Sequence, residues 1–377
     1  MIKWMFKYGM VIFLFNTLLL SIGETSSFAK NIFMGLMVFY AIILIINTLQ
    51  VKNVILHKAF IFLFSLNILN LFYFILFHSI TDIEAIKYLL ARAVQFSIIS
   101  ISIYYNYNYF SKIFLKHIVY ISLGVIFLGI IIDPFIFSGR YSGLFWNPNM
   151  LSSFTCIAFA SLFFSKQKFS RSDYASLFLM LLVILATGSR GALGAILLAF
   201  FFKYKFSVRN IIYALLASIT YFLLINIQLD TSINRFADQS LFNDRLLQYK
   251  YAFETIMLSP IIGSGLDKYQ YISPEVIPYF LQGQIGAHNG YLAILVQYGF
   301  IFGLLILGII FYQTIRSYLI IEKKDPAQLF YFYIIFYALF ASFYETMMTG
   351  INEFHTILFW FSLAFLSYSI YKKQHES

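Results

Sequence analysis

Long, nearly uninterrupted apolar runs recur along almost the whole chain, and most have the length needed to cross a lipid bilayer. A spanning helix needs about 20 consecutive apolar residues, and solid runs differ from the alternating pattern of a membrane β-barrel strand. Apolar residues make up 61% of the 377 residues and charged residues only 11%, whereas a soluble domain has about 25% charged residues. The composition excludes a soluble globular protein and a disordered chain, and it predicts an all-α polytopic membrane protein.

The apolar runs predict about twelve transmembrane helices in a single integral membrane domain covering residues 1–377. No small-residue cleavage site follows the first run at Leu20, so we expect that run to be a retained helix and not a signal peptide. The longest break, residues 229–289, contains several charges and prolines and is the expected large loop between the ninth and tenth helices. The expected spans are 8–22, 31–49, 59–78, 86–104, 117–137, 145–165, 173–188, 190–205, 210–228, 290–312, 328–346 and 354–371.

The basic residues indicate which side of the membrane each loop faces. Cytoplasmic loops carry an excess of Lys and Arg. With the N-terminus in the cytoplasm, most of the 26 Lys and Arg residues fall in cytoplasmic segments and most of the 16 Asp and Glu residues fall outside. Both termini are then cytoplasmic, and the loop at 229–289 is extracytoplasmic. The net charge of +10 therefore reflects topology. Because no basic patch carries interleaved stacking or groove-reading residues, we expect no nucleic-acid partner.

Residues 173–205 could form one long helix or two short ones. A single helix would place the basic residues at 166–171 on the opposite side from those at 203–209, against the charge pattern. The sequence therefore predicts two helices that turn at residues 187–191. Each would be only about 24 Å long at 1.5 Å per residue. We expect the turn to lie below the membrane surface in a protein-lined cavity, because non-helical backbone at that depth is tolerated only there.

Four polar clusters fall on the predicted extracytoplasmic side, and each joins a loop to a helix end. Together they offer three arginines and a histidine on one face of the membrane. The clusters are residues 139–149 with Arg140, Asn147 and Asn149, residues 188–191 with Arg190, residues 243–265 with Arg245, and residues 286–290 with His288 and Asn289.

Arg190 and His288 have the clearest chemical interpretations. A charge within a membrane segment is costly and usually faces a cavity and a partner. The planar fork of Arg190 suits a phosphate, and the alternative is an interfacial arginine that reaches lipid headgroups. His288 suits proton abstraction from a hydroxyl, while Asn289 could orient the ring or bind a sugar. Taken alone, His288 fits better as a helix-entry residue with Asn289 as the N-cap. A zinc site is not expected, because no second His or Cys lies at ligand spacing.

Arg245 begins a run with apolar residues at helical spacing, which predicts a helix along the membrane surface. On that helix Arg245 is either an anion ligand or a solvated charge. Asn147 and Asn149 flank a proline and form by default a turn into a helix, and the functional alternative is a carbohydrate or phosphate contact.

The glycines and glutamates of this face are less specific. Gly263, Gly265 and Gly286 are expected to form turns. Three outer-face glutamates could bind acceptor sugars, and the sequence offers no physical ground for choosing among them: Glu254, Glu345 and Glu353.

The order of these motifs resembles the O-antigen ligase / O-antigen polymerase family of bacterial membrane glycosyltransferases. The resemblance covers about residues 130–310 in motifs and the whole chain in topology. Three residues after the position of Gly299, ligases tend to have Gly, Thr or Tyr, whereas this chain has Phe302. The matching pieces are Arg140–Asn149, Thr187–Gly191, Asn243–Arg245, Pro260–Leu266, and His288-Asn289 with Gly299 ten residues after the Asn.

The resemblance implies glycan transfer from an undecaprenyl-diphosphate-linked donor to a glycan acceptor, on the outer face of the bacterial cytoplasmic membrane, without a metal or cofactor. It implies that His288 is the general base for the acceptor hydroxyl, that Arg190 and Arg245 bind the donor diphosphate, and that Arg140 assists. An in-line attack would invert the anomeric configuration. Membrane lipids are further expected partners, and whether a chain-length regulator binds is left open.

Two activities occur within this family. A polymerase joins lipid-linked repeat units of a surface polysaccharide such as O-antigen or capsule, and a ligase transfers the glycan to lipid A-core. Phe302 and a composition typical of an AT-rich genome, such as that of a Gram-positive host without lipopolysaccharide, favour the polymerase. The alternative of another class is a lipid-linked glycan transporter or flippase. Transporters often show internal repeats, and we find none between the two halves. A non-catalytic scaffold would not need His288 and the arginines to act together.

Overall fold

The computed structural model describes residues 2–204, 212, 243–283, 285–322 and 324–376. These residues form α-helices and loops with one 3-10 turn, Tyr279–Leu281, and an isolated antiparallel bridge between Ile22 and Phe145. The prediction of an all-α protein is therefore confirmed for the described part of the chain. The helices are α1 (Ile2–Leu20), α2 (Ser26–Ile46), α3 (Thr48–Ile55), α4 (Ile61–Phe77), α5 (Ile83–Lys112), α6 (Phe114–Ile132), α7 (Pro148–Ser165), α8 (Arg171–Ala186), α9 (Arg190–Tyr204), α12 (Asn243–Leu258), α13 (Gly290–Ile320), α14 (Pro326–Ala341) and α15 (Phe354–Glu376).

Several of these helices are suited to a membrane. Among the described residues, six helices are long and apolar enough to cross a bilayer, namely α2, α5, α6, α7, α13 and α15, and α4 and α14 are shorter apolar helices. The chain is thus a multi-pass membrane protein, while the count of twelve spans remains a prediction. The expected span at 210–228, apart from Ile212, and residues 229–242 of the expected loop lie outside the described residues.

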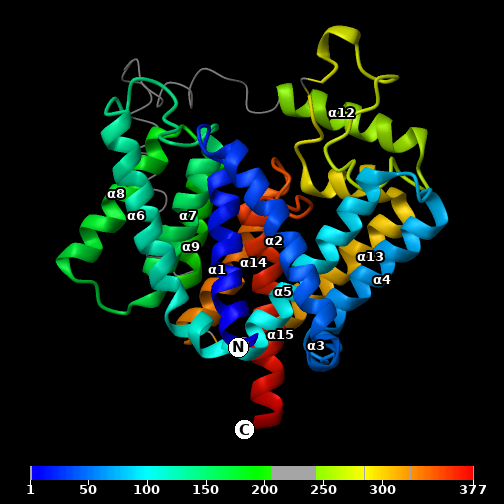
Figure 1. Cartoon of the computed structure of the whole chain (residues 1–377). Coiled ribbons are helices and arrows are strands. Elements are labelled where there is room, and N and C mark those ends of the chain that lie inside the picture. Colours follow the sequence, from blue (N-terminus) through cyan, green and yellow to red (C-terminus); the bar gives the residue numbers. More distant parts are fainter. Residues whose placement is uncertain (1, 205–211, 213–242, 284, 323, 377) are drawn as a thin grey trace.

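The helix α15 forms the centre of the molecule. It packs against α14, α5, α13 and α1, and 83% of its most apolar window is buried within the protein. In Figure 1, α14 and α15 lie in the middle, with α6 to α9 on one side and α4 and α13 on the other. Buried aromatic side chains fill this centre, such as Tyr331, Phe361 and Phe365, whose rings pack against each other. Apolar burial of this extent holds the helices at fixed positions.

The two ends of the helix bundle differ. Both termini lie at one end, whereas α12 and the loop that follows it cover the opposite end above α13 (Figure 1). The termini are thus on the same side, as the charge pattern predicts; that this side is cytoplasmic remains a prediction. Helix α12 is the helix predicted from the run that begins at Arg245.

The described residues 173–204 lie in two short helices, α8 and α9, and the turn between them, which confirms that prediction. Helix α8 begins with a capping box, in which the Ser170 hydroxyl accepts from the Asp173 N–H and the Asp173 carboxylate accepts from the Ser170 N–H. It ends at Ala186, and α9 begins only four residues later at Arg190. Between them Gly188 has φ +62°, a left-handed conformation that glycine adopts without steric cost.

Helix α13 is interrupted at Gly299, the glycine of the last sequence motif. Gly299 has φ +66° and ψ −174°, and the loop at 260–265 fills the gap: Pro260 O accepts a hydrogen bond from Phe300 N at 2.7 Å. The approach is so close that a Cβ on Gly263 would lie 2.4 Å from Gly299 N. The hydroxyl of Tyr73 on α4 donates to Ile262 O at 2.6 Å and closes the arrangement. These glycines therefore fix the loop after α12 against α13.

Candidate active site

Glu345 is the point at which four segments of the chain meet. It lies in the loop between α14 and α15. Its Oε1 accepts hydrogen bonds from Nδ2 of Asn149 at 3.0 Å and from Nη2 of Arg245 at 3.1 Å. Its Oε2 lies 3.7 Å from Nδ1 of His288, which is an ion-pair distance but too long for a hydrogen bond. Three residues that the sequence singles out, Asn149, Arg245 and His288, are thus gathered around one carboxylate. We call these four residues the Glu345 cluster.

Arg140 extends this cluster toward the α8–α9 hairpin. Its Nη2 donates to Oδ1 of Asn149 at 2.7 Å, and its Nε donates to the carbonyl of Thr187 at 3.3 Å. Next to it, Tyr141 N donates to Ala186 O at 3.0 Å. The loop before α7 is therefore attached to the end of α8, and the amide of Asn149 connects Arg140 to Glu345.

Arg190 is the first residue of α9 and lies in the same region. A Cβ on the adjacent Gly191 would be 2.1 Å from the hydroxyl oxygen of Tyr344, so only glycine lets this turn approach the loop that carries Glu345. Tyr344 directly precedes Glu345. The structure thus packs the turn of the second motif against Tyr344, the residue before Glu345, and places the N-terminus of α9 at this turn, where the helix dipole favours an anion.

His288 has an unusual backbone and an unsatisfied ring nitrogen. Its φ of +32° is positive, which is uncommon for a residue with a side chain and costs about 1–3 kcal/mol when it is held in place. Its Nδ1 is buried and makes no hydrogen bond with the described residues, yet the side chain as a whole is 36% exposed. Because Nδ1 faces Glu345, the exposed part is the rest of the ring. A ring with one nitrogen beside a carboxylate and an accessible opposite edge is suited to take up a proton.

The two asparagines at helix entries have capping roles. Oδ1 of Asn289 accepts from the N–H groups of Tyr291 and Leu292, both at 3.0 Å, and Oδ1 of Asn147 accepts from Asn149 N at 2.8 Å. These are the structural alternatives considered from the sequence. Substrate contacts for Asn147 and Asn289 remain predictions. Asn149 differs from them, because its side chain bonds to both Arg140 and Glu345.

Close backbone packing places His288 beside Glu345. The N–H of Gly290 at the start of α13 donates to Ser342 O at 2.8 Å, and a Cβ on Gly290 would lie 2.7 Å from Ser342 Oγ. The carbonyl of Phe343 accepts from Nδ2 of Asn289 at 3.1 Å and also from the hydroxyl of Tyr249 on α12. The loop after α14 therefore binds α12 and α13 at once, and it brings Arg245 and His288 to the same carboxylate.

The groups around Glu345 keep it ionised. Burial alone would raise the pKa of this carboxyl group, but its interaction with His288 and the charge of Arg245 outweigh burial and lower the pKa below its ordinary value. The cluster therefore contains one fixed negative charge facing the imidazole.

Glu345 is a candidate functional residue that sequence reasoning could not select. Glu254 is paired on the surface of α12 with Lys250 at 3.9 Å, and Glu353 is paired with His355 at 3.2 Å. Within the described part of the chain, Glu345 is the one of the three that forms hydrogen bonds or an ion pair with residues from the sequence motifs. No sequence motif distinguishes Glu345 from Glu254 and Glu353, because the partners of Glu345 come from segments that are distant in sequence.

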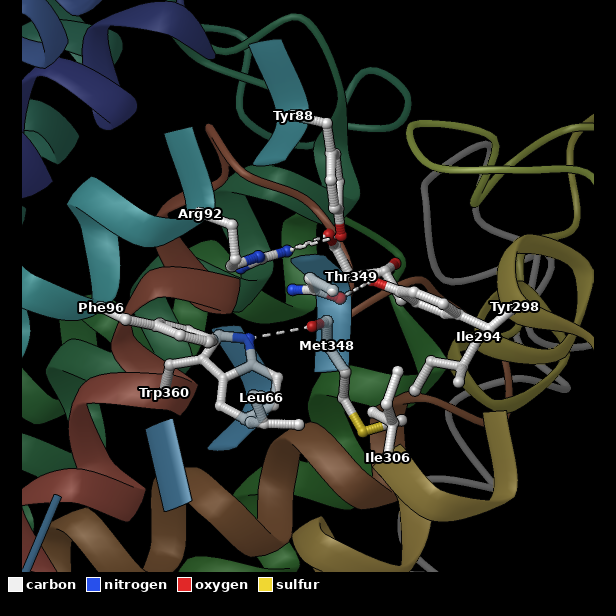
Figure 2. A pocket seen from close by; sticks show the side chains of 11 residues that line it. Leu66, Tyr88, Arg92, Phe96, Ile294, Tyr298, Ile306, Met348, Thr349 and Trp360 are labelled. Atoms are coloured by element: carbon white, nitrogen blue, oxygen red, sulfur yellow. Dashed lines mark hydrogen bonds between the residues drawn. The ribbon is translucent and has the colours of Figure 1, made fainter. Parts of the chain in front are cut away.

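A buried arginine, which the sequence analysis did not single out, supports the same loop from α5. Arg92 Nη2 donates to the carbonyl of Thr349 at 2.5 Å and to the hydroxyl of Tyr88 at 3.2 Å. Figure 2 shows Arg92, Tyr88 and Thr349 together around a small cavity, with the indole N–H of Trp360 bonded to Met348 O at 3.0 Å. Arg92 and Trp360 thus hold residues 348–349 of the loop that carries Glu345. Because Arg92 binds carbonyls and uncharged side chains, its role here is positioning.

The family comparison covers most of this site. A family model described as O-antigen ligase matches residues 175–308, the segment that contains Arg190, Arg245 and His288. Arg140, Asn149 and Glu345 lie outside the matched range, and the structure brings them to it. No protein among the curated proteins matches the chain. The match over residues 175–308 confirms the resemblance of this chain to the O-antigen ligase/polymerase family of membrane enzymes.

Proposed function

We propose that the protein is a membrane glycosyltransferase that polymerises undecaprenyl-diphosphate-linked oligosaccharide repeat units into a surface polysaccharide. The observation that supports this most directly is the convergence of His288, Arg245 and Asn149 on the carboxylate of Glu345, with Arg140 bonded to Asn149 and the Gly191 turn packed on Tyr344. A base and several fixed cations at one place suit a reaction in which a hydroxyl loses a proton and a diphosphate departs.

In the proposed reaction, Nε2 of His288 takes the proton of an acceptor sugar hydroxyl. The hydroxyl oxygen forms a bond to the anomeric carbon of the donor, and the bond from that carbon to the diphosphate oxygen breaks, with the electron pair leaving on the diphosphate. Because attack and departure are in line, the anomeric configuration inverts. Glu345 lies 3.7 Å from Nδ1, so its negative charge stabilises the imidazolium that forms, the electrostatic role of the carboxylate in a catalytic triad.

The arginines bind the diphosphate in this proposal. The guanidinium of Arg245 has five N–H donors. Its hydrogen bonds within the described part of the chain go to Glu345 and Gln248, which leaves donor capacity for phosphate oxygens. Arg190 adds a second planar fork at the N-terminus of α9. Arg140, already bonded to Asn149, contributes a third positive charge. Fixed cations matter here because charge develops on the leaving group in the transition state.

We prefer the polymerase to the ligase because Phe302 departs from the residues that ligases tend to carry at this position. Phe302 packs against Tyr73 and Phe77, so the larger ring is accommodated by the helix packing. The AT-rich composition is consistent with a host that lacks lipid A-core. The orientation follows from the charge pattern: both termini face the cytoplasm, and the Glu345 cluster faces outward.

The surface polysaccharide profile of a deletion strain tests this proposal. The strain is complemented with wild type, with His288→Ala, or with His375→Ala, a control at an exposed histidine near the C-terminus. We expect single repeat units in the deletion strain and a ladder restored by wild type and the control but not by His288→Ala. Long lipid-linked chains that stay unattached in the deletion strain would indicate a ligase. A ladder restored by His288→Ala would remove the catalytic assignment and favour a transporter.

A further inference from the structure

A second polar pocket lies at the end of the bundle opposite the Glu345 cluster, where α1 begins and α15 ends (Figure 1). Its volume is about 610 Å³, which is within the range of ligand sites. Lys3 and Lys7 of α1 and Lys372 of α15 line it, and no acidic residue is among the described residues that do so. We call it the Lys3–Lys7 pocket.

A break in α5 shapes this pocket. Asn106 has non-helical backbone angles, φ −130° and ψ 29°, inside an otherwise continuous helix. Its Nδ2 donates to the carbonyl of Lys3 at 3.0 Å, so the break fixes the first turn of α1 against α5. The stretch 104–109 then presents tyrosine and asparagine side chains to the pocket, which are hydrogen-bonding groups for a polar ligand.

Lys7 lies over two aromatic rings, and neither Lys3 nor Lys7 has a carboxylate partner among the described residues. Nζ of Lys7 lies 4.6 Å from the ring centroid of Tyr109 and 4.8 Å from that of Tyr8, which are cation–π distances. Lys3 and Lys7 form no salt bridge within the described part of the chain. No side chain of the described residues therefore neutralises the charges of Lys3 and Lys7, and a pocket of this composition favours an anion.

An apolar stripe leads from the pocket along the outside of α1. Trp4, Tyr8, Ile12 and Phe15 are all exposed, and their spacing of four, four and three residues places them on one helix face. Trp4 and Tyr8 pack together with ring centroids 4.9 Å apart. Tryptophan and tyrosine at a helix end, followed by apolar residues, are typical of a membrane interface and the acyl region beside it. The pocket thus joins an anion-binding end to a surface suited to an acyl chain.

We propose that the Lys3–Lys7 pocket binds the phosphate headgroup of an anionic phospholipid, with an acyl chain along the exposed stripe of α1. Basic pockets between transmembrane helices are known to suit anionic headgroups, and the stripe distinguishes a lipid from a soluble phosphate. This site is separate from the proposed glycan chemistry and does not depend on it.

Lipid binding to the full-length protein tests the proposal by native mass spectrometry in detergent, with phosphatidylglycerol and phosphatidylcholine as probes. The pocket variant is Lys3→Gln/Lys7→Gln/Lys372→Gln. Its matched control, Lys52→Gln/Lys58→Gln/Lys116→Gln, removes the same charge from exposed lysines outside the pocket. We expect wild type and the control to prefer phosphatidylglycerol, and the pocket variant to bind it at least about tenfold more weakly, since each lysine near an anionic surface contributes about fivefold.

Three results would overturn the proposal. The pocket variant and the control could bind phosphatidylglycerol equally, phosphatidylcholine could bind as well as phosphatidylglycerol, or millimolar inorganic phosphate could displace the lipid, which would indicate a site for soluble phosphate. If the triple variant does not insert into the membrane, Lys7→Gln alone serves as the test, with an expected loss of about fivefold and an unchanged affinity as the contradicting result.

Discussion

Replacing Glu345 with glutamine removes one negative charge from the candidate site and changes little else. The glutamine amide oxygen can still accept from Asn149 and Arg245, which now bond to Oε1 at 3.0 and 3.1 Å. What disappears is the charge 3.7 Å from Nδ1 of His288. Because the proposed reaction turns this imidazole into an imidazolium, the substitution should raise the barrier of the chemical step.

The size of the effect follows from the distance and the exposure. Two unit charges about 4 Å apart interact by about 4 kcal/mol at an effective dielectric constant of about 20. The Glu345 side chain is 22% exposed, so solvent screening lowers this value, and we take about 2 kcal/mol as lying between the surface and unscreened limits. That corresponds to a decrease in kcat of about 30-fold.

The assay measures the initial rate at which purified protein extends a lipid-diphosphate-linked repeat unit, as a function of donor and acceptor concentration. Glu254→Gln is the matched control, because Glu254 lies on the surface of α12 and pairs with Lys250 instead of His288. Glu345→Asp keeps the charge and should retain more activity than Glu345→Gln. A kcat of Glu345→Gln equal to that of the control would refute the argument that this carboxylate stabilises the imidazolium.

Three further predictions concern the arginine, a glycine and pH. Arg190→Lys keeps the charge but loses the planar fork, so activity should fall sharply; wild-type extension rates would rule out bidentate diphosphate binding. Gly263→Ala should lower the melting temperature, because the residue has a φ of +81° and its new Cβ would lie 2.4 Å from a backbone nitrogen. Gly283→Ala, at φ +74° with open space around the Cβ, tests the backbone strain alone. An equal fall in melting temperature for the two variants would contradict the close-packing argument. Since the pKa of Glu345 is lowered in the folded protein, its stabilising contribution is fully present above the unfolded pKa of about 4.3 and is lost as pH falls through the lower folded value. The stability difference between wild type and Glu345→Gln should therefore decrease only as pH falls below about 4.3, and a difference that already decreases as pH falls from 6 to 5 would contradict the lowered pKa.

Much of the architecture could be predicted from the sequence because membrane helices are determined by local composition. Apolar length identifies them, and charge asymmetry separates one hairpin from one long helix at residues 173–205. The glycine motifs were also informative, since Gly299 and Gly263 adopt backbone angles that other residues disfavour. These are properties of short segments and need no knowledge of the packing.

The centre of the candidate site could not be predicted in the same way. Glu345 becomes important only because Ser342 and Phe343 accept hydrogen bonds from the start of α13 and from α12. Arg92 likewise looks like one charge in an apolar run, and only the fold shows that it binds the carbonyl of Thr349. Such long-range contacts depend on how helices pack, which a single sequence does not display.

The most direct test of the proposed glycosyl transfer uses purified protein in lipid nanodiscs with a defined undecaprenyl-diphosphate-linked repeat unit as both donor and acceptor. Products are separated by length, and the new linkage is assigned by NMR. We predict a ladder of extended products with inverted anomeric configuration from wild type and none from His288→Ala. Extension by His288→Ala at the wild-type rate, or a retained configuration, would contradict the role assigned to His288 and the single in-line displacement.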